Sequence, residues 1–600
     1  FRAARVHTMN ALGSFGAADW AVVAGVLALT TVVGWIAGRR GSIREYFLGG
    51  RTLPWWAVSG SIVATEISAL TLVSVPAIVF APGGNFTYLQ LAVIGNIAAR
   101  CLVAWLLVPA WYEREIYSPY DYVEARLGKR ARQMTSALFA LGGVLAQGAR
   151  LYLTALVLEI LLHDELADFA ARTHISSLAF SIGIIGAFAV LWTWIGGMAS
   201  VVWTDLVLLV VFTAAAACAL FFAIHALDTG VARFVQVGVD AHKFRFFDFD
   251  TSPARAYTFW AAILAASWGG VGAYGMDQTM AQRVFCCGTV RDARKALVWS
   301  SLSVLVTVLV AFVGVALFAW YERFPLDGEA LALWRANPDR ILPLFVVEHV
   351  PSPWKGLIVA GIFAAAISTL AGVFTALSQT ALVNLYDPFR AATNADGERR
   401  RVRAARLFVL LAGVVLCTSA LAMKRAQGQY ASVLDLGLAL AGFTQGALLA
   451  AFFLAWLARR PDGSGFLWSA PLSVAWVFGL AWHGDGPELA LRVFALAFFA
   501  LWVARRVRPV WRERGARGAL VLQTLGLVAG LAGVLWANAH ALFLVPTSTH
   551  AAPEYALQPL QFPWYVPVGS VVAFVYGHWL ARSGNSAGEF VPARAEHRAA

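Results

Sequence analysis

Charged residues are scarce in this chain of 600 residues: Asp, Glu, Lys and Arg together make up 13%, whereas hydrophobic residues make up 60%. This excludes an ordinary soluble domain, in which about a quarter of the residues are charged. The 46 basic residues outnumber the 34 acidic ones, but they gather in the connections between apolar runs. That placement is typical of cytoplasmic loops in a membrane protein, so we expect a lipid bilayer and no nucleic acid as partner.

Cysteine is also rare. The five cysteines, Cys101, Cys218, Cys286, Cys287 and Cys417, show no C-x-x-C or Cys/His spacing of the kind that binds a metal. Cys286 and Cys287 fall in a connection that we place in the cytoplasm, where thiols stay reduced. The sequence therefore predicts no disulfide framework, and we interpret the cysteines as packing residues.

Enzyme signatures are missing as well. We find no H-E-x-x-H, G-x-S-x-G or P-loop pattern in the chain. A polytopic membrane enzyme would need a catalytic constellation of this kind. We therefore expect no enzymatic activity.

Long apolar runs are what the sequence has in abundance. We count about fifteen runs long enough to cross a bilayer as helices, which predicts an all-α polytopic membrane protein. Basic residues cluster at 39–51, 114–132, 283–295, 399–406 and 505–517, always on the same side of the predicted membrane. The positive-inside rule makes that side the cytoplasm, which puts the N-terminus outside and the C-terminus inside the inner (plasma) membrane.

The apolar runs also divide the chain. The predicted segments are an outer N-terminus (1–19), a leading helix with its inner loop (20–53), a ten-helix transport core (54–458), additional C-terminal transmembrane helices (459–582) and a polar cytoplasmic tail (583–600). The stretch before Met9 lacks the apolar core of a signal peptide, and Met9 is the expected initiator.

A carboxylate lies in the middle of the first core run. Glu66 stands in the small-residue stretch 64–68, midway along the run 54–80. Burying it at mid-membrane depth costs at least about 2.5 kcal/mol, so it should face a cation, a polar partner or water. Small and hydroxyl-bearing neighbours are typical of a helix that unwinds and turns carbonyl groups toward an ion. The alternative is a structural pair with a neighbouring helix.

Two later stretches have a similar character. The segment 268–275 holds four glycines and is predicted to be a second broken helix. The stretch 364–369 ends in Ser368 and Thr369, whose hydroxyls suit a small alkali cation; ordinary small-residue helix packing is the alternative. The two broken segments take the first and sixth positions of the ten-helix block, as an inverted five-plus-five repeat would place them.

Five motifs in this order resemble those of the sodium:solute symporter family: GRTLPWW at 50–56, YDYVEARLG at 120–128, the glycine turn 196–198 with 202–205, DQ and QR within 277–283, and the stretch 365–369. The resemblance implies a LeuT-type 5+5 inverted-repeat core, with one leading helix and about four extra C-terminal helices. It also implies a symporter that couples sodium to the import of a small organic solute by alternating access.

The resemblance further implies a sodium site. Its ligands, by position, are the backbone oxygens of Ala64, Ile67 and Ala365 and the hydroxyls of Ser368 and Thr369. Glu66, Ser68 and Asp205 are linked to sodium less directly. Glu66 stands where the proline branch of the family has Asp, and Asp205 matches an acidic residue on the cytoplasmic exit route of the ion. For Asp205 the alternative is a carboxylate stabilised by a helix N-terminus.

Candidate solute contacts near the implied central cavity are Gln90, Arg150, Tyr152, Trp268, Tyr274, Asp277 and Gln445, although aromatic residues at helical spacing also fit plain packing. A buried Arg150 suits an anionic or zwitterionic solute, because its local alternative partner, Glu159, lies on a different turn. The solute could be an amino acid, a carboxylate or a sugar. A transporter-like sensor or regulatory protein, which an attached kinase domain would favour, and a proton-coupled symporter using Glu66 are the alternatives.

Overall fold

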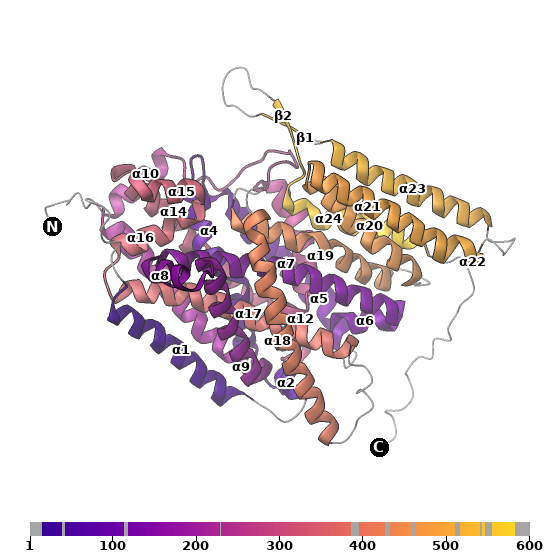
Figure 1. The fold of residues 1–600 in the computed structure, drawn as a ribbon, viewed down its shortest axis with the longest axis horizontal. Coiled ribbons are helices and arrows are strands. Elements are labelled where there is room, and N and C mark those ends of the chain that lie inside the picture. The colour runs from indigo at the N-terminus through magenta and orange to yellow at the C-terminus, as the bar shows by residue number, and fades with distance from the viewer. Residues whose placement is uncertain are drawn as a thin grey trace.

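The computed structural model describes residues 15–38, 43–112, 118–161, 163–227, 230–385, 395–426, 432–457, 463–510, 517–540, 543–546 and 555–581. Our expectations for Met9 and for the tail 583–600 lie outside these residues. Within them the protein is built from helices, with one antiparallel pair of short strands, β1 (Phe543–Pro546) and β2 (Tyr555–Gln558), as Figure 1 shows.

The first half of the chain forms α1 (Ala17–Ala37), α2 (Ile43–Leu48), α3 (Trp55–Glu66), α4 (Ala69–Phe80), α5 (Asn96–Tyr112), α6 (Pro119–Leu127), α7 (Lys129–Leu161), α8 (His163–Thr173), α9 (Ser177–His225), α10 (Val231–Asp240), α11 (Ser267–Gly275), α12 (Gln278–Val284) and α13 (Val290–Trp299). The second half forms α14 (Ser303–Arg323), α15 (Gly328–Ala336), α16 (Ile341–His349), α17 (Trp354–Leu385), α18 (Ala395–Ala426), α19 (Val433–Leu457), α20 (Gly463–Ala481), α21 (Asp485–Trp502), α22 (Arg508–Val510), α23 (Arg517–Ala539) and α24 (Tyr565–Trp579).

Twelve described spans are long and apolar enough to cross a membrane, and the bent pair α3 and α4 makes thirteen. The sequence predicted about fifteen crossings. The other two fall on shorter helices, namely α24 and α11 with the π-helical turn Ala261–Ala266 before it. The chain is a multi-pass helical membrane protein, as predicted.

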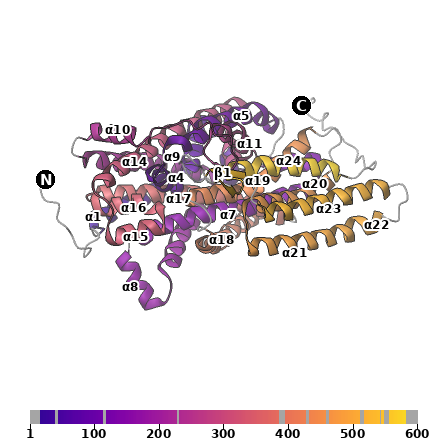
Figure 2. The same cartoon turned by 90° about the horizontal axis from the view of Figure 1, so that it is seen from above.

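The helix α17 lies at the centre and packs against α1, α7, α9 and α18. A second group forms around α19, which packs against α7, α20 and α24. Figures 1 and 2 show α20, α21, α23 and α24 together at the end of the molecule away from α1. The C-terminal helices therefore extend the molecule on one side and leave α1 against the other.

The tight turn predicted at Gly196 and Gly197 is a break inside α9, which divides it into the spans Ser177–Trp194 and Gly197–His225. Gly197 has φ 65°, in the left-handed region that favours glycine. A Cβ there would lie 2.9 Å from the Tyr46 carbonyl oxygen. Glycine is therefore required both by the backbone conformation and by the close approach of α2.

The first predicted broken helix is confirmed, because α3 and α4 meet at an angle of 54°. The second break lies outside the stretch that we predicted. Residues 267–275 form the continuous helix α11, and the chain breaks after it, at Met276 and Asp277. The glycines serve packing instead: a Cβ on Gly270 would lie 2.5 Å from Ala99, and one on Gly275 would lie 2.5 Å from Leu107.

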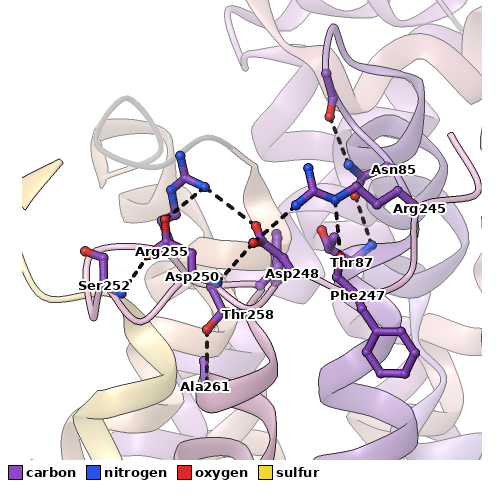
Figure 3. A network of polar contacts seen from close by, with 12 residues as sticks. Asn85, Thr87, Arg245, Phe247, Asp248, Asp250, Ser252, Arg255, Thr258 and Ala261 are labelled. Atoms are coloured by element: carbon purple, nitrogen blue, oxygen red, sulfur yellow. Dashed lines mark hydrogen bonds and ion pairs between the residues drawn. The ribbon is translucent and has the colours of Figure 1, made fainter. Parts of the chain in front are cut away.

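A long connection between α10 and α11 is held by ion pairs (Figure 3). Arg255 lies 3.6 Å from Asp248 and 3.3 Å from Asp250, and Arg245 lies 3.3 Å from Asp248. All four side chains come from the same connection. The ion pairs therefore fold it into a local unit.

Gln90 ties this connection to the transmembrane helices. Its side chain is fully buried and donates to the carbonyls of Thr87 at 3.2 Å and Tyr257 at 3.3 Å, while its oxygen accepts from the Asp248 N–H at 3.4 Å. With both ends of its amide engaged by backbone groups, Gln90 has a structural role here. We therefore leave it out of the proposed solute site.

Candidate functional site

The first part of the site is the break between α3 and α4. The Ile67 N–H still donates to the Val63 carbonyl at 2.9 Å, but the Ser68 N–H turns to the Thr71 hydroxyl at 3.3 Å. In a continuous helix Ser68 would donate to the Ala64 carbonyl, so the break releases that carbonyl from the helical ladder. The predicted backbone ligands Ala64 and Ile67 thus stand where the helix gives up its own hydrogen bonds.

On α17, the predicted ligands Ala365, Ser368 and Thr369 are all buried, with at most 3% exposed. The Thr369 hydroxyl donates to the Ala365 carbonyl at 2.9 Å, and the Ser368 hydroxyl donates to Asp205 Oδ1 at 2.5 Å. Because each hydroxyl is the donor in its bond, each oxygen keeps lone pairs with which to bind a cation. The donor set therefore fits sodium, a hard cation that prefers oxygen ligands.

Asp205 links four helices. This fully buried residue of α9 accepts hydrogen bonds from Ser61 of α3 and from Ser368 of α17. Arg283 of α12, also fully buried, donates to Asp205 Oδ2 at 3.1 Å and to the Ser61 hydroxyl at 2.9 Å. The helices α3, α9, α12 and α17 therefore meet in one buried hydrogen-bonded network.

The charge of Asp205 is balanced inside this network by Arg283. The alternative from the sequence, a carboxylate at a helix N-terminus, is wrong, because Asp205 lies more than two turns beyond Gly197, where its span begins. Asp205 thus contacts the predicted sodium ligand Ser368 without depending on sodium for its own neutralisation. Arg283 belongs to the QR motif within 277–283, but the sequence alone does not single it out as a site residue.

A small cavity of about 30 Å³ adjoins Ser368. It lies between α1, α9 and α17, and its lining includes Thr30, Ser200 and Thr204. A volume of this size holds about one water molecule or a small ion. The leading helix α1 therefore helps to enclose the surroundings of the predicted sodium ligands.

Glu66, the carboxylate at the α3 break, faces an arginine. Its side chain, 22% exposed, forms an ion pair with Arg100 of α5, which is fully buried. Asn96 donates to Glu66 Oε1 at 3.2 Å, and the Tyr274 hydroxyl donates to the same oxygen at 3.0 Å. Arg100 also donates to the Ser303 hydroxyl at 3.1 Å. Glu66 is therefore held by three side chains from α5 and α11.

Sequence reasoning missed Arg100. The signal was present, because Arg100 stands alone in the apolar run 89–111 and the rule that singled out Glu66 applies equally to a buried cation. The cation that faces Glu66 in the structure thus comes from the protein itself. Ser68, the third residue that we linked to sodium, is 2% exposed and precedes the first turn of α4.

Arg150 of α7 has a different environment. Among the described residues its guanidinium has one hydrogen-bond partner, the Gln147 side chain at 3.4 Å, and no carboxylate lies within 4.0 Å. Glu159, its alternative partner from the sequence, lies 3.8 Å from Arg340 instead. Arg150 therefore carries a positive charge that none of the described carboxylates contacts directly.

Asp277 lies at the second break and accepts from the Thr279 N–H at 2.7 Å, which caps α12. Its carboxylate and that of Glu66 attract Arg150. Gln445 of α19 packs against α11, where a Cβ on Gly272 would lie 3.1 Å from it. These residues and Tyr274 form what we call the central polar cluster: Glu66, Arg150, Tyr274, Asp277 and Gln445.

Two predicted solute contacts lie away from this cluster. Trp268 donates to the Ser570 hydroxyl of α24 at 2.7 Å and stacks on Phe453 with 5.2 Å between ring centroids. Tyr152 is 3% exposed, and the charges near its phenol are those of Arg340, Glu159 and Asp339. Trp268 thus anchors a C-terminal helix, and neither residue joins the central polar cluster.

A membrane span broken between α3 and α4, with polar groups gathered there and at the break between α11 and α12, is typical of a class of secondary transporters. The family model described as the sodium:solute symporter family matches residues 46–472. The chain therefore belongs to the sodium:solute symporter family. It is a sodium-coupled solute symporter and not an enzyme, with sodium as a co-transported ion.

Individual relatives agree with this. The sodium/sialic acid symporter SiaT of Proteus mirabilis is 25% identical over 483 residues, which cover 79% of this chain and 91% of that protein. Sodium-coupled monocarboxylate transporter 2 of Danio rerio is 27% identical over 456 residues, which cover 74% of this chain and 68% of that protein. A substrate-bound, outward-open structure of a Na⁺-coupled sialic acid symporter has a TM-score of 0.67, with 21% identity, and covers 94% of this chain and 97% of that chain. This structural likeness confirms the predicted LeuT-type fold.

Proposed function

We propose that this symporter imports a small solute that carries a carboxylate group, and that Arg150 binds this carboxylate. The observation that carries the proposal is that the Arg150 guanidinium has no carboxylate within 4.0 Å among the described residues. Arg100 and Arg283, two fully buried arginines of the same core, are each paired with an acid. A half-buried guanidinium that no described carboxylate contacts favours an anionic ligand, which it can bind through two parallel hydrogen bonds.

The names of two relatives support this solute class. One transports sialic acid and the other monocarboxylates, and both names denote carboxylic acids. The remaining members of the central polar cluster, Tyr274, Asp277 and Gln445, would contact the rest of the solute. Asp277 would attract an amino group, so the cluster also suits a zwitterion.

We further propose that sodium binds between α3 and α17. Its ligands would be the backbone oxygens of Ala64, Ile67 and Ala365 and the hydroxyls of Ser368 and Thr369. The released Ala64 carbonyl and the lone pairs of the two hydroxyls support this set. Glu66, Ser68 and Asp205 would act from the surroundings, Asp205 by orienting the Ser368 hydroxyl.

This arrangement accounts for coupling. The break between α3 and α4 carries proposed sodium ligands, and Glu66 at the same break belongs to the central polar cluster. Sodium would therefore favour one geometry of the break, and the solute would bind best to that geometry. One positive charge moving inward through 100 mV releases about 2.3 kcal/mol, to which the sodium gradient adds.

The placement in the membrane is also a proposal. Basic connections on one side support an inner (plasma) membrane protein with its N-terminus outside and its C-terminus in the cytoplasm. In this arrangement 20–53 forms the leading helix with its loop, 54–458 the transport core and 459–582 the additional helices. The segments 1–19 and 583–600 would be the outer and inner ends.

Uptake into proteoliposomes tests the solute class. We expect sodium-dependent uptake of one or more carboxylates from a panel of monocarboxylates, sialic acid, amino acids and glucose. Arg150→Gln should raise the solute concentration for half-maximal uptake about 10- to 100-fold, because one charge-assisted contact is lost. Arg150→Lys keeps the charge but not the planar fork, so its effect should be smaller.

The matched control is Arg233→Gln, in an exposed ion pair with Glu322 on α14 and outside the central polar cluster. It should leave uptake unchanged. Efficient sodium-driven uptake of glucose alone, with no carboxylate transported, would contradict the proposed role of Arg150.

A further inference from the structure

A hollow of about 440 Å³ lies between α5 and α13, and its lining includes no residue of the central polar cluster. Its lining includes Trp105 of α5 and Arg291, Arg294, Lys295 and Trp299 of α13. Three basic side chains and two tryptophans thus surround a space large enough for a polar ligand group. Neither the sodium site nor the solute site accounts for it.

Within the part of the chain that the structure describes, the positive charges of this hollow have no acidic partner. Among the described residues, no carboxylate lies within 4.0 Å of Arg291, Arg294 or Lys295. The nearest acidic residue along the helix, Asp292, accepts from the Thr289 hydroxyl at 2.8 Å, at the start of α13. The described residues of the hollow therefore carry a net positive charge, which favours the binding of an anion.

The protein holds one of these cations in place. Arg294 donates from Nε to the Ala104 carbonyl of α5 at 3.0 Å, and its guanidinium lies 5.1 Å from the Trp105 ring centroid. Lys295 Nζ lies 5.7 Å from the ring of Trp55, at the start of α3. The contact with Ala104 uses one N–H of the guanidinium and leaves the others available to a ligand.

The surroundings of the hollow are those of a membrane surface. Trp105 and Trp299 are 64% and 53% exposed, and tryptophan side chains gather at the level of the lipid headgroups. Further along, Leu102 of α5 and Leu305 of α14, which continues the span that α13 begins, are 44% and 66% exposed. Cations at one end and exposed leucines beyond them match the headgroup and the acyl chains of a lipid.

We propose that this hollow binds the phosphate headgroup of an anionic membrane lipid. Arg291, Arg294 and Lys295 contact the phosphate oxygens, and the acyl chains follow Leu102 and Leu305. Basic pockets between transmembrane helices on the cytoplasmic side are suited to anionic headgroups, and guanidinium groups bind phosphate through paired hydrogen bonds. The inference rests on the proposed cytoplasmic placement of α13 and is independent of the identity of the solute.

The test is a binding measurement on the full chain in detergent. Short-chain phosphatidylglycerol should raise the midpoint of thermal unfolding, and phosphatidylcholine of the same chain length should not. In the variant R291Q/R294Q/K295Q the apparent affinity for phosphatidylglycerol should fall about 100-fold, as expected when three basic contacts are removed. Native mass spectrometry should show lipid retained by the wild type and lost from this variant.

The control is R400Q/R401Q/R403Q on α18, which removes the same charge from another predicted cytoplasmic cluster. In this variant phosphatidylglycerol should raise the midpoint of thermal unfolding as it does in the wild type. If the first variant does not fold, R291Q alone serves, because Arg291 is exposed; its affinity should fall about fivefold. An unchanged phosphatidylglycerol response in either of these α13 variants would overturn the proposal. If inorganic phosphate shifted the midpoint of thermal unfolding equally, the hollow would be a site for the free anion. If phosphatidylcholine shifted it equally, the hollow would be an apolar groove without headgroup recognition. Either result would also overturn the proposal.

Discussion

Glu66 and Asp205 are each held by an arginine from another helix, Arg100 and Arg283. A buried ion pair adds little net stability, but removing one partner leaves an uncompensated charge and is strongly destabilising. A substitution at Glu66 that leaves Arg100 unpaired should therefore lower the stability of the protein. A role of Glu66 next to sodium would instead show as a change in sodium affinity, so the two measurements separate the two roles.

We expect Glu66→Gln to lower the free energy of unfolding by about 3 kcal/mol, because the buried Arg100 then lacks its carboxylate. The double variant Glu66→Gln/Arg100→Gln should recover part of this loss, since neither charge remains. Thermal unfolding in detergent measures both. If Glu66→Gln kept its stability but needed much more sodium for half-maximal uptake, Glu66 would lie beside the ion, as its position in the family implies.

Ser368 and Thr369 provide the direct test of the sodium site. Each substitution to Ala removes one proposed hydroxyl ligand, which corresponds to about 1–3 kcal/mol or one to two decades in sodium affinity. The sodium dependence of uptake in proteoliposomes measures this. Thr375→Ala is the matched control, because Thr375 lies on the same helix, is fully buried and donates to the Ala371 carbonyl at 2.8 Å. A double variant of Ser368 and Thr369 with unchanged sodium dependence would place the ion elsewhere.

The carboxylates were predictable from the sequence, and their partners were not. Glu66 stood out because it interrupts an apolar run, and this property needs no knowledge of the fold. Its pairing with Arg100 joins α3 to α5 across 34 residues of sequence, and only the packing of these helices brings the two together. The same holds for Arg283, which reaches Asp205 across 78 residues.

At the scale of elements, the helices followed from the apolar runs, but the second break did not follow from its glycines. Glycine in a helix costs about 1 kcal/mol relative to Ala, so four in a short stretch suggested unwinding. In the structure α11 stays helical because its glycines let α5 approach closely: Gly270 meets Ala99 and Gly275 meets Leu107. The packing of α11 against α5 offsets the helix-propensity cost of these glycines. The sequence shows this cost but does not show the packing.

Gly275→Ala tests this explanation. The new Cβ would lie 2.5 Å from Leu107 Cδ2, and such overpacking costs about 1–3 kcal/mol. We therefore expect a lower midpoint of thermal unfolding. The control is Gly143→Ala in the middle of α7, where a Cβ meets nothing within 4 Å, and there the better helix propensity of Ala should raise stability by about 0.5–1 kcal/mol. Equal effects at both positions would mean that the glycines of α11 do not serve helix packing.

At the scale of the whole molecule, the parity of the membrane crossings decides whether the two termini lie on the same side of the membrane or on opposite sides. Thirteen spans include the bent pair α3 and α4, and α11 and α24 bring the predicted total to about fifteen. Both totals are odd, so the termini should lie on opposite sides whether these two short helices both cross or neither does. If only one crossed, the termini would share a side.

Reporter fusions decide between these arrangements. A fusion after Arg401, in the basic part of α18, should be active with a cytoplasmic reporter and silent with a periplasmic one, because the positive-inside rule keeps this cluster in the cytoplasm. A fusion after Asp250, in the connection shown in Figure 3, should give the reverse pattern. A third fusion after Arg508, between α21 and α23, tests the C-terminal helices and should match Arg401. A periplasmic reporter that is active after Arg401 would contradict the proposed topology. If it were active only after Arg508, the number of membrane crossings between Arg401 and Arg508 would be odd instead of even.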